Sequence, residues 1–181
     1  MGLDMYLERR IYIGRDWEGK RKKRKMTIDT SLEGKKEIDF SQVKELVFDA
    51  GYWRKANAIH QWFVDNVQDG KDDCKDYYVS RDDLEKLLKI VNEVLENSKL
   101  VNGEVVNGYS FKDGEKIPNI EKGKVIKNPE KAKELLPTAE GFFFGSYDYD
   151  QWYYNDLVET KKILEKALKE KDGEFYYSSS W

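Results

Sequence analysis

The sequence contains one cysteine, one histidine and three prolines among its 181 residues. A single cysteine, Cys74, excludes an internal disulfide and a zinc site built from cysteines, and the single histidine, His60, excludes a metal site built from several histidines. No apolar run is long enough to span a bilayer. Charged residues at positions 4, 8, 9 and 10 interrupt any signal-peptide pattern, so we expect a cytoplasmic protein with no membrane partner.

Motifs of the common phosphate-binding and nucleophilic enzymes are also missing. The chain has no Walker A sequence, no Gly-x-Gly-x-x-Gly and no Gly-x-Ser-x-Gly. Cys74 follows Asp72 and Asp73, and their carboxylates oppose the formation of a reactive thiolate. These absences favour a protein that is not an enzyme and that carries no cofactor.

Charged residues, by contrast, make up 37% of the chain, and aromatic residues 14%. The aromatic content argues against disorder. The net charge is only −3, but residues 20–25 form an unbroken basic run, KRKKRK. Such a run attracts phosphates, yet no aromatic residue interrupts it, so we interpret it as a solvated hairpin tip. Nucleic acid is therefore a weak alternative among the partners.

The N-terminal part predicts strands. Apolar residues recur at a period of two over residues 3–13, which is typical of a strand with one buried face. We expect residues 26–28 to return antiparallel to it and residues 37–40 to add a short strand. Ser41 offers an N-cap to a short helix, and Gly51 interrupts the helical pattern with a bend.

Three helices are predicted in the middle of the chain. Residues 52–67 have apolar side chains at helical spacing. The expected core stripe of this helix consists of Tyr52, Ala56, Ile59, Phe63 and Val67. Ser80 and Asp83 resemble a capping box at the start of a second helix, and Asn128 with Pro129 predicts the start of a short third helix.

The C-terminal part predicts a buried strand, a long helix and a closing strand. The apolar residues 141–145 are the buried strand, and Ser146 or Asp148 caps the helix that follows. Residues 174–181 alternate in a strand pattern, so we expect the terminal Trp181 to be buried in the sheet, in a pocket or in a subunit interface.

These elements predict one α+β domain over residues 1–181. We expect an antiparallel sheet with three to four helices packed on it. Residues 100–126 contain two Asn-Gly pairs and one Asp-Gly pair, each a tight-turn signal, so they predict a small β-meander that projects from the domain.

Polar and aromatic side chains line one side of the helix predicted over residues 52–67. Tryptophan stacks on flat groups, arginine pairs with phosphate, and amide side chains hydrogen-bond base edges. Tyrosines near residues 147–154 and the aromatic C-terminus would complete a pocket, whereas ordinary helix packing is the structural alternative. The candidate ligand-binding residues are Trp53, Arg54, Asn57, His60, Gln61, Tyr147, Tyr154, Tyr176 and Trp181.

Two groups of carboxylates supply the enzymatic alternative, a metal-dependent hydrolase or phosphodiesterase. The candidate metal ligands are Asp69, Asp72, Asp73, Asp148 and Asp150. Neither group has the EF-hand spacing. Asp-Gly at positions 69–70 suits a turn, and acids in the first turn of a helix complement its dipole, so we favour structural roles for both groups.

Several sequence blocks resemble a family of small proteins that tailed phages and prophages encode. The blocks are residues 1–7 (MGLDMYL), 52–64 (YWRKANAIHQWFV), 67–70 (VQDG), 72–74 (DDC), 135–138 (LLPT), 141–150 and 175–181. They extend over nearly the whole chain, with residues 100–126 the least distinctive part. The resemblance supplies no catalytic residues, so no residue role is transferred from it.

The resemblance implies an accessory protein that acts inside a bacterial host cell. Such proteins often counter host defence, and by analogy one class sequesters nucleotide-derived signals. We therefore expect a phage-encoded, non-enzymatic protein that binds a small phosphorylated or nucleotide-like molecule. A protein that inhibits a host defence complex through exposed aromatics stays open as an alternative, and so does a homo-oligomer.

Overall fold

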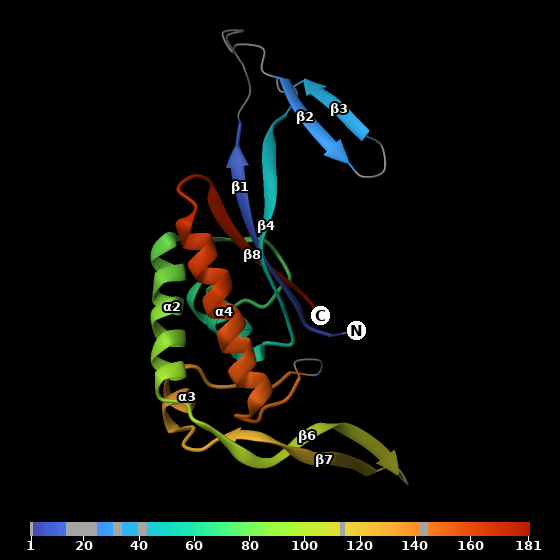
Figure 1. Cartoon of the computed structure of the whole chain (residues 1–181), viewed down its shortest axis with the longest axis vertical. Coiled ribbons are helices and arrows are strands. Elements are labelled where there is room, and N and C mark those ends of the chain that lie inside the picture. Colours follow the sequence, from blue (N-terminus) through green and yellow to red (C-terminus); the bar gives the residue numbers. More distant parts are fainter. Residues whose placement is uncertain (1, 14–24, 31–33, 40–42, 113–114, 142–144) are drawn as a thin grey trace.

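The computed structural model describes residues 2–13, 25–30, 34–39, 43–112, 115–141 and 145–181 (Figure 1). Within these ranges the chain forms eight strands and four helices, which confirms the predicted α+β class. The strands are β1 (Asp4–Tyr12), β2 (Lys25–Thr30), β3 (Gly34–Asp39), β4 (Glu45–Arg54), β5 (Tyr77–Val79), β6 (Leu100–Lys112), β7 (Glu115–Ile126) and β8 (Glu174–Ser180). The helices are α1 (Asn57–Asn66), α2 (Arg81–Glu96), α3 (Glu130–Leu135) and α4 (Gln151–Lys169).

A four-stranded antiparallel sheet in the order β4-β1-β8-β5 organises the fold. The first and last strands of the chain are neighbours in its centre. The predicted alternation in the first segment is confirmed, because Leu3, Met5 and Leu7 are fully buried whereas Tyr6 is exposed. The closing strand is confirmed as β8, which buries Tyr177.

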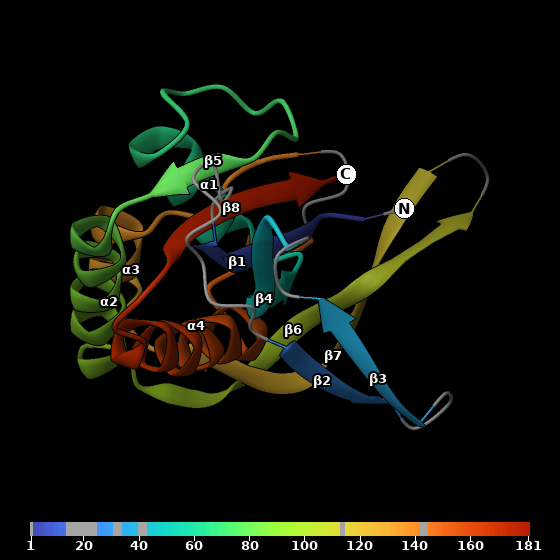
Figure 2. The ribbon, with the colours of Figure 1, turned by 90° about the horizontal axis from the view of Figure 1, so that it is seen from above.

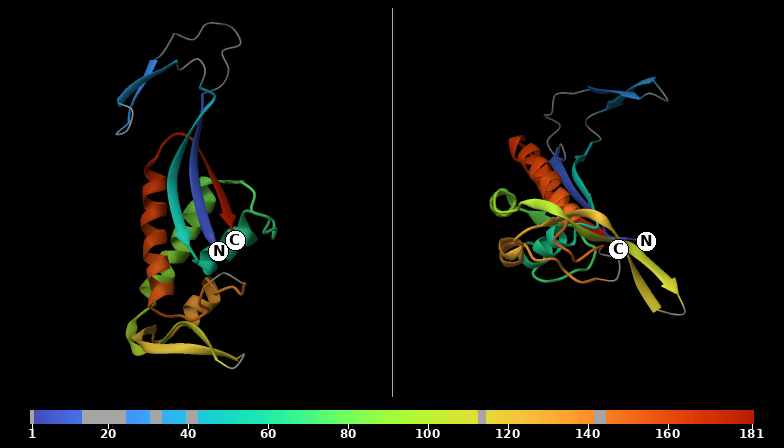
Figure 3. Two further views of the ribbon diagram at one scale, coloured as in Figure 1. Left: turned by 90° about the vertical axis from the view of Figure 1, so that its right-hand side faces the viewer. Right: turned by 60° about the horizontal axis from the view of Figure 1, so that its bottom comes forward.

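Helices cover one face of this sheet, where α2 and α4 lie side by side (Figures 1 and 3). From α1, Phe63 stacks on Tyr177 of β8 with 4.0 Å between the ring centroids. Burial of this apolar face supplies the main favourable free energy of folding. The other face of the sheet carries the exposed rings of Tyr6, Tyr52 and Tyr78.

Two predictions for the N-terminal part are wrong. Residues 26–28 belong to β2, which pairs with β3 and not with β1. The segment around Gly51 is the strand β4, which pairs along β1, and not a bent helix. A Cβ at Gly51 would lie 2.3 Å from Cγ2 of Ile163, so this glycine allows α4 to approach the strand closely. Ser41 and residues 20–24 of the basic run lie outside the described residues.

Helix α1 begins five residues later than predicted, at Asn57. Residues 52–54 continue β4, and Lys55 has a φ of +60°, which stops the strand. The predicted stripe is correct at Ile59 and Phe63, both buried, but Tyr52 lies on the open face of the sheet. The helical spacing gave a wrong prediction for residues 52–54 because a strand with alternating side chains is followed directly by a helix.

The predicted start of α2 is confirmed. The hydroxyl of Ser80 accepts a hydrogen bond from the backbone N–H of Asp83 at 3.1 Å. Helix α3 starts one residue later than expected, with Pro129 at the N-cap in place of Asn128 and with no side-chain hydrogen bond there. The predicted cap of α4 is wrong, because Asp150 occupies the N-cap in place of Ser146 or Asp148. Asp150, two positions after Asp148, performs the same physical role, because its carboxylate accepts the first backbone N–H groups of the helix.

Strands β6 and β7 form a single long hairpin rather than a meander with three turns. The Asn-Gly pair at 102–103 lies inside β6, and the pair at 107–108 coincides with a shift of register. The hairpin extends away from the helices, as Figure 2 shows. Val125 near its base forms a β-bridge with Asp150, so the hairpin is attached at the start of α4.

At the C-terminus, Trp181 is buried neither in the sheet nor in the pocket described below, because its side chain is 49% exposed within the chain. Residues 142–144 of the predicted buried strand lie outside the described residues. In the part of the chain that the structure describes, no helix is both long and apolar enough to cross a membrane.

Candidate functional site

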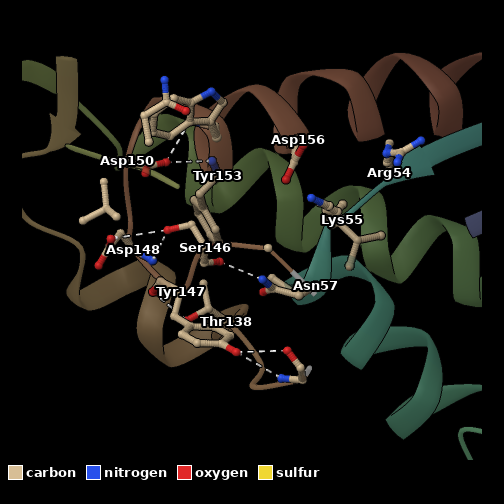
Figure 4. A pocket seen from close by; sticks show the side chains of 18 of the residues that line it. Arg54, Lys55, Asn57, Thr138, Ser146, Tyr147, Asp148, Asp150, Tyr153 and Asp156 are labelled. Carbon is tan, nitrogen blue, oxygen red and sulfur yellow. Dashed lines mark hydrogen bonds between the residues drawn. The ribbon is translucent and has the colours of Figure 1, made fainter. Parts of the chain in front are cut away.

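A pocket of about 570 Å³ lies where several segments distant in sequence meet (Figure 4). Its walls come from the end of β4, the start of α1, the loop before α4, the first turns of α4 and the shifted part of β6. This volume is within the usual range for small-molecule sites. The pocket is therefore the candidate site.

Two cationic side chains, Arg54 and Lys55, lie at one side of the pocket (Figure 4). The Arg54 side chain is 60% exposed, and its Nη1 lies 3.7 Å from the Asp4 carboxylate. A long, exposed contact of this kind contributes little stability. The Lys55 ammonium has no hydrogen bond or ion pair within the described ranges. Both cations are therefore available to an anion.

The turn that carries these cations is fixed by Gly145 of the loop before α4. Gly145 has a φ of +94°, and Lys55 itself has a φ of +60°. A Cβ at Gly145 would lie 3.2 Å from both Cβ and the carbonyl oxygen of Lys55. Glycine is thus required by the backbone angle and by the space, and the contact holds the turn in place.

Asn57, the first residue of α1, ties the same loop to the helix. Its Nδ2 donates to the carbonyl oxygen of Ser146 at 2.8 Å, and its Oδ1 accepts from the backbone N–H of Ala139 at 3.1 Å. The Tyr147 hydroxyl donates to the carbonyl oxygen of Gly141 at 3.0 Å. These bonds build the loop wall of the pocket before any ligand arrives, which lowers the entropy cost of binding.

Three carboxylates line the rest of the pocket: Asp148, Asp150 and Asp156. The Oδ1 of Asp150 accepts the backbone N–H groups of Trp152 and Tyr153, at 2.8 and 3.2 Å. Its Oδ2 is buried and has no partner in the described part of the chain. Burial raises the pKa of Asp150 above the usual range of a carboxyl group.

Asp156 is half-buried on α4, between Asp150 and the two cations in Figure 4. Its carboxylate has no hydrogen bond or ion pair to any described residue. Burial, and secondly the negative charge of Asp150, raise the pKa of Asp156 to about 7. At neutral pH this side chain therefore exchanges readily between the protonated and the ionised form.

The pocket brings together three of the nine predicted ligand-binding residues, Arg54, Asn57 and Tyr147. It also contains Asp148 and Asp150, which the sequence suggested as metal ligands. No group of three or more Asp, Glu, His or Cys among the described residues is arranged to hold a metal ion. The pocket thus mixes cations and carboxylates without a metal-binding arrangement.

Trp53 lies in the core and not in the pocket. Its side chain is 3% exposed, and its Nε1 donates to the hydroxyl of Thr160 at 2.9 Å. The indole ring packs at a tilt against Phe63. Because side chains alternate along β4, Trp53 faces the helices while Arg54 faces away from them.

His60 is fully buried and joins two distant segments. Its Nδ1 lies 2.8 Å from the Tyr177 hydroxyl, and its Nε2 lies 3.0 Å from Oδ2 of Asp72. The indole N–H of Trp181 donates to the other oxygen of Asp72 at 3.1 Å. These residues attach the end of β8 to the acidic loop after α1, which is a structural role.

The other predicted ligand-binding residues lie away from the pocket. Gln61 donates to Asp65 within α1. Tyr176 lies on the open face of the sheet, with the Arg10 guanidinium 4.4 Å from its ring centroid. Tyr154 is on α4 but does not line the pocket.

In the acidic loop after α1, the Asp73 carboxylate forms its hydrogen bonds with nearby residues of the same segment. Asp73 accepts from the Lys75 ammonium at 2.7 Å and from the Tyr77 hydroxyl at 3.1 Å. Asp69 has a φ of +51°, as residues in tight turns do. These contacts account for Asp69 and Asp73 as loop residues.

Sequence reasoning missed Lys55 and Asp156. A signal existed for each: Lys55 stands between Arg54 and Asn57, and Asp156 belongs to the acidic stretch at 148–156. Neither signal was sufficient, because only the left-handed turn at Lys55 and the packing of α4 beside it direct these side chains to one pocket.

No family model, curated protein or solved structure matches the chain.

Proposed function

We propose that the protein binds a small phosphorylated, nucleotide-like molecule in this pocket and releases it unchanged. The observation that carries the proposal is the pairing of Arg54 and Lys55, two cations in sequence with almost no partners, at the side of a preformed pocket. Guanidinium and ammonium groups in such a position favour phosphate oxygens.

The remaining walls suit the rest of a nucleotide. Tyr109 from the hairpin and Trp152 from α4 line the pocket and offer flat surfaces to a base. Carboxylates such as Asp156 accept hydrogen bonds from hydroxyl or N–H groups. A ligand with an anionic end and a donor-bearing end would match this distribution of charge.

Binding without turnover is supported by the role of three polar pocket residues. Asn57, Ser146 and Tyr147 use their polar atoms to hold the loop, as the hydrogen bonds above show. Asp148 accepts from the Ser146 hydroxyl at 3.3 Å, so it also belongs to the loop. Sequestration of a nucleotide-derived signal against host defence is the biological role that the phage-family resemblance suggests for such a protein.

The test is calorimetric titration of the full chain with AMP, GMP, CMP and UMP. We expect at least one to bind, and Arg54→Ala and Lys55→Ala each to weaken that binding about tenfold, the usual effect of losing a charge-assisted hydrogen bond. Lys44→Ala is the control, an exposed lysine just before β4 that does not line the pocket.

Chromatography of the recovered nucleotide tests the absence of turnover. Intact nucleotide after prolonged incubation supports a binding protein, whereas release of nucleoside and phosphate would indicate the hydrolase. If none of the four nucleotides binds, or if the Arg54 and Lys55 variants bind like the wild type, the proposal is wrong.

A further inference from the structure

We infer that the carboxylate of Asp156 accepts hydrogen bonds from the sugar of the ligand. The pocket therefore selects a ribose, which has two vicinal hydroxyls, over a deoxyribose. This inference rests on the proposed function, because it assumes that a phosphate lies at Arg54 and Lys55. It concerns a specificity-determining residue and a narrower ligand class, phosphorylated ribosides.

Several polar side chains of the pocket are already engaged by the protein. The side-chain amide of Asn57 is engaged at both ends, and the hydroxyls of Thr138, Ser146 and Tyr147 all donate to other groups of the loop. The charged lining groups that remain are Arg54, Lys55, the carboxylate of Asp156 and the buried Oδ2 of Asp150.

In Figure 4, Asp156 lies between the cations on one side and Asp150 on the other. In a nucleoside phosphate, the sugar is the part next to the phosphate. A phosphate held by Arg54 and Lys55 thus places the sugar, rather than the base, in the middle of the pocket beside Asp156.

An ionised carboxylate only accepts hydrogen bonds, and its two oxygens can accept from two neighbouring hydroxyls at once. Ribose offers the 2′ and 3′ hydroxyls on adjacent carbons, whereas 2′-deoxyribose offers one. The buried carboxylate of Asp150 behind Asp156, with its unpartnered Oδ2, adds negative charge that favours an approaching O–H donor.

The experiment compares each of AMP, GMP, CMP and UMP with its 2′-deoxy form by calorimetric titration at about pH 8, where Asp156 is ionised. We expect the ribonucleotide to bind about tenfold more tightly, since a hydrogen bond to a charged group is lost in the deoxy form. Asp156→Asn should reduce this ratio to about twofold or less, because one acceptor oxygen becomes a donor. Glu159→Gln, an exposed carboxylate on the same helix, should leave the ratio unchanged.

A pH series on the wild type gives a second readout that needs no variant. The other charged groups that line the pocket are Arg54, Lys55, Asp148 and Asp150. Protonation of the ligand phosphate near pH 6 affects both sugar forms equally, so it cancels in their ratio. The ratio should fall as the pH falls through about 7, the pKa of Asp156.

The outcomes separate this inference from the proposed function. Equal binding of ribose and deoxyribose forms, still dependent on Arg54, would overturn the role of Asp156 and leave the nucleotide pocket intact. A ratio that survives in Asp156→Asn, or that is constant with pH, would overturn it as well. Failure of every nucleotide to bind would overturn both proposals.

Discussion

At the scale of single residues, Asp156 combines partial burial with a carboxylate that no described residue pairs. The native side chain keeps its proton up to about pH 7, whereas the ordinary carboxyl value is 3.8. Between these values the native state binds more protons than the unfolded chain, so the stability of the wild type falls as the pH rises. Above about pH 7 the whole cost of the buried charge is present.

Asp156→Asn should therefore raise the free energy of unfolding at about pH 8, by at least about 1 kcal/mol, since one pKa unit corresponds to about 1.4 kcal/mol. In acid, near the ordinary carboxyl pKa, the wild type and the variant should have nearly equal stability because both side chains are neutral. Urea denaturation at the two pH values measures the difference. A gain that is the same at both values would show that the charge of Asp156 is not its cause.

The sequence predicted some of the pocket residues correctly and others wrongly. Arg54 and Asn57 were singled out because their chemistry suits a phosphorylated ligand, and both line the pocket. Trp53 and His60 were singled out on the same grounds, yet both are buried among structural partners. The sequence specifies the chemistry of each side chain, but the backbone conformation decides whether that side chain points into the core or into the pocket.

At the scale of elements, the contact between α4 and β4 depends on Gly51. A methyl group there would meet Cγ2 of Ile163 at 2.3 Å, so the helix would have to move away from the strand. We expect Gly51→Ala to destabilise the protein by about 1–3 kcal/mol, the usual cost of overpacking a core. Thermal unfolding should show this as a loss of about 2–4 °C for each kcal/mol in a chain of this length.

A double-mutant cycle provides the control for this contact. Ile163→Ala removes the side-chain atoms that a Cβ at position 51 would meet. Gly51→Ala should cost less in that background, with a coupling energy of at least about 0.5 kcal/mol. Strictly additive effects would mean that the cost of alanine at position 51 does not come from the contact with Ile163.

Element prediction succeeded where a local signal coincided with the tertiary structure. The cap at Ser80 is an example, because a hydroxyl and a backbone N–H three residues later need no distant partner. The prediction failed at β4, because Gly51 was interpreted as a bend in a helix and Tyr52 matches the spacing of a helical stripe. The pairing with β1 decides that segment, and pairing partners lie far away in sequence.

At the scale of the whole molecule, the β6–β7 hairpin forms one wall of the pocket while its outer part makes little contact with the core. Tyr109, Ile117 and Ile120 are 49%, 42% and 61% exposed. Val106 and Ile120 face each other in register, so residues 107–119 can be replaced by Asn-Gly, a two-residue turn that preserves the pairing.

The shortened protein should keep its melting temperature within a few degrees, because little apolar surface is lost from the core. Nucleotide binding should weaken at least fivefold, about 1 kcal/mol, because Tyr109 is removed from the pocket wall. Scanning fluorimetry and calorimetric titration measure the two effects. Unchanged affinity would place the ligand away from the hairpin.

The sequence by itself determined the α+β class, the buried face of β1, the start of α2 and the closing strand β8. Each of these depends on periodicity or on a cap, which are properties of neighbouring residues. Only the tertiary structure decided that β1 pairs with both β4 and β8. It likewise decided that Arg54, Lys55 and Asp156 share one pocket, because a pocket is made by segments whose contact depends on packing across the whole chain and not on local spacing.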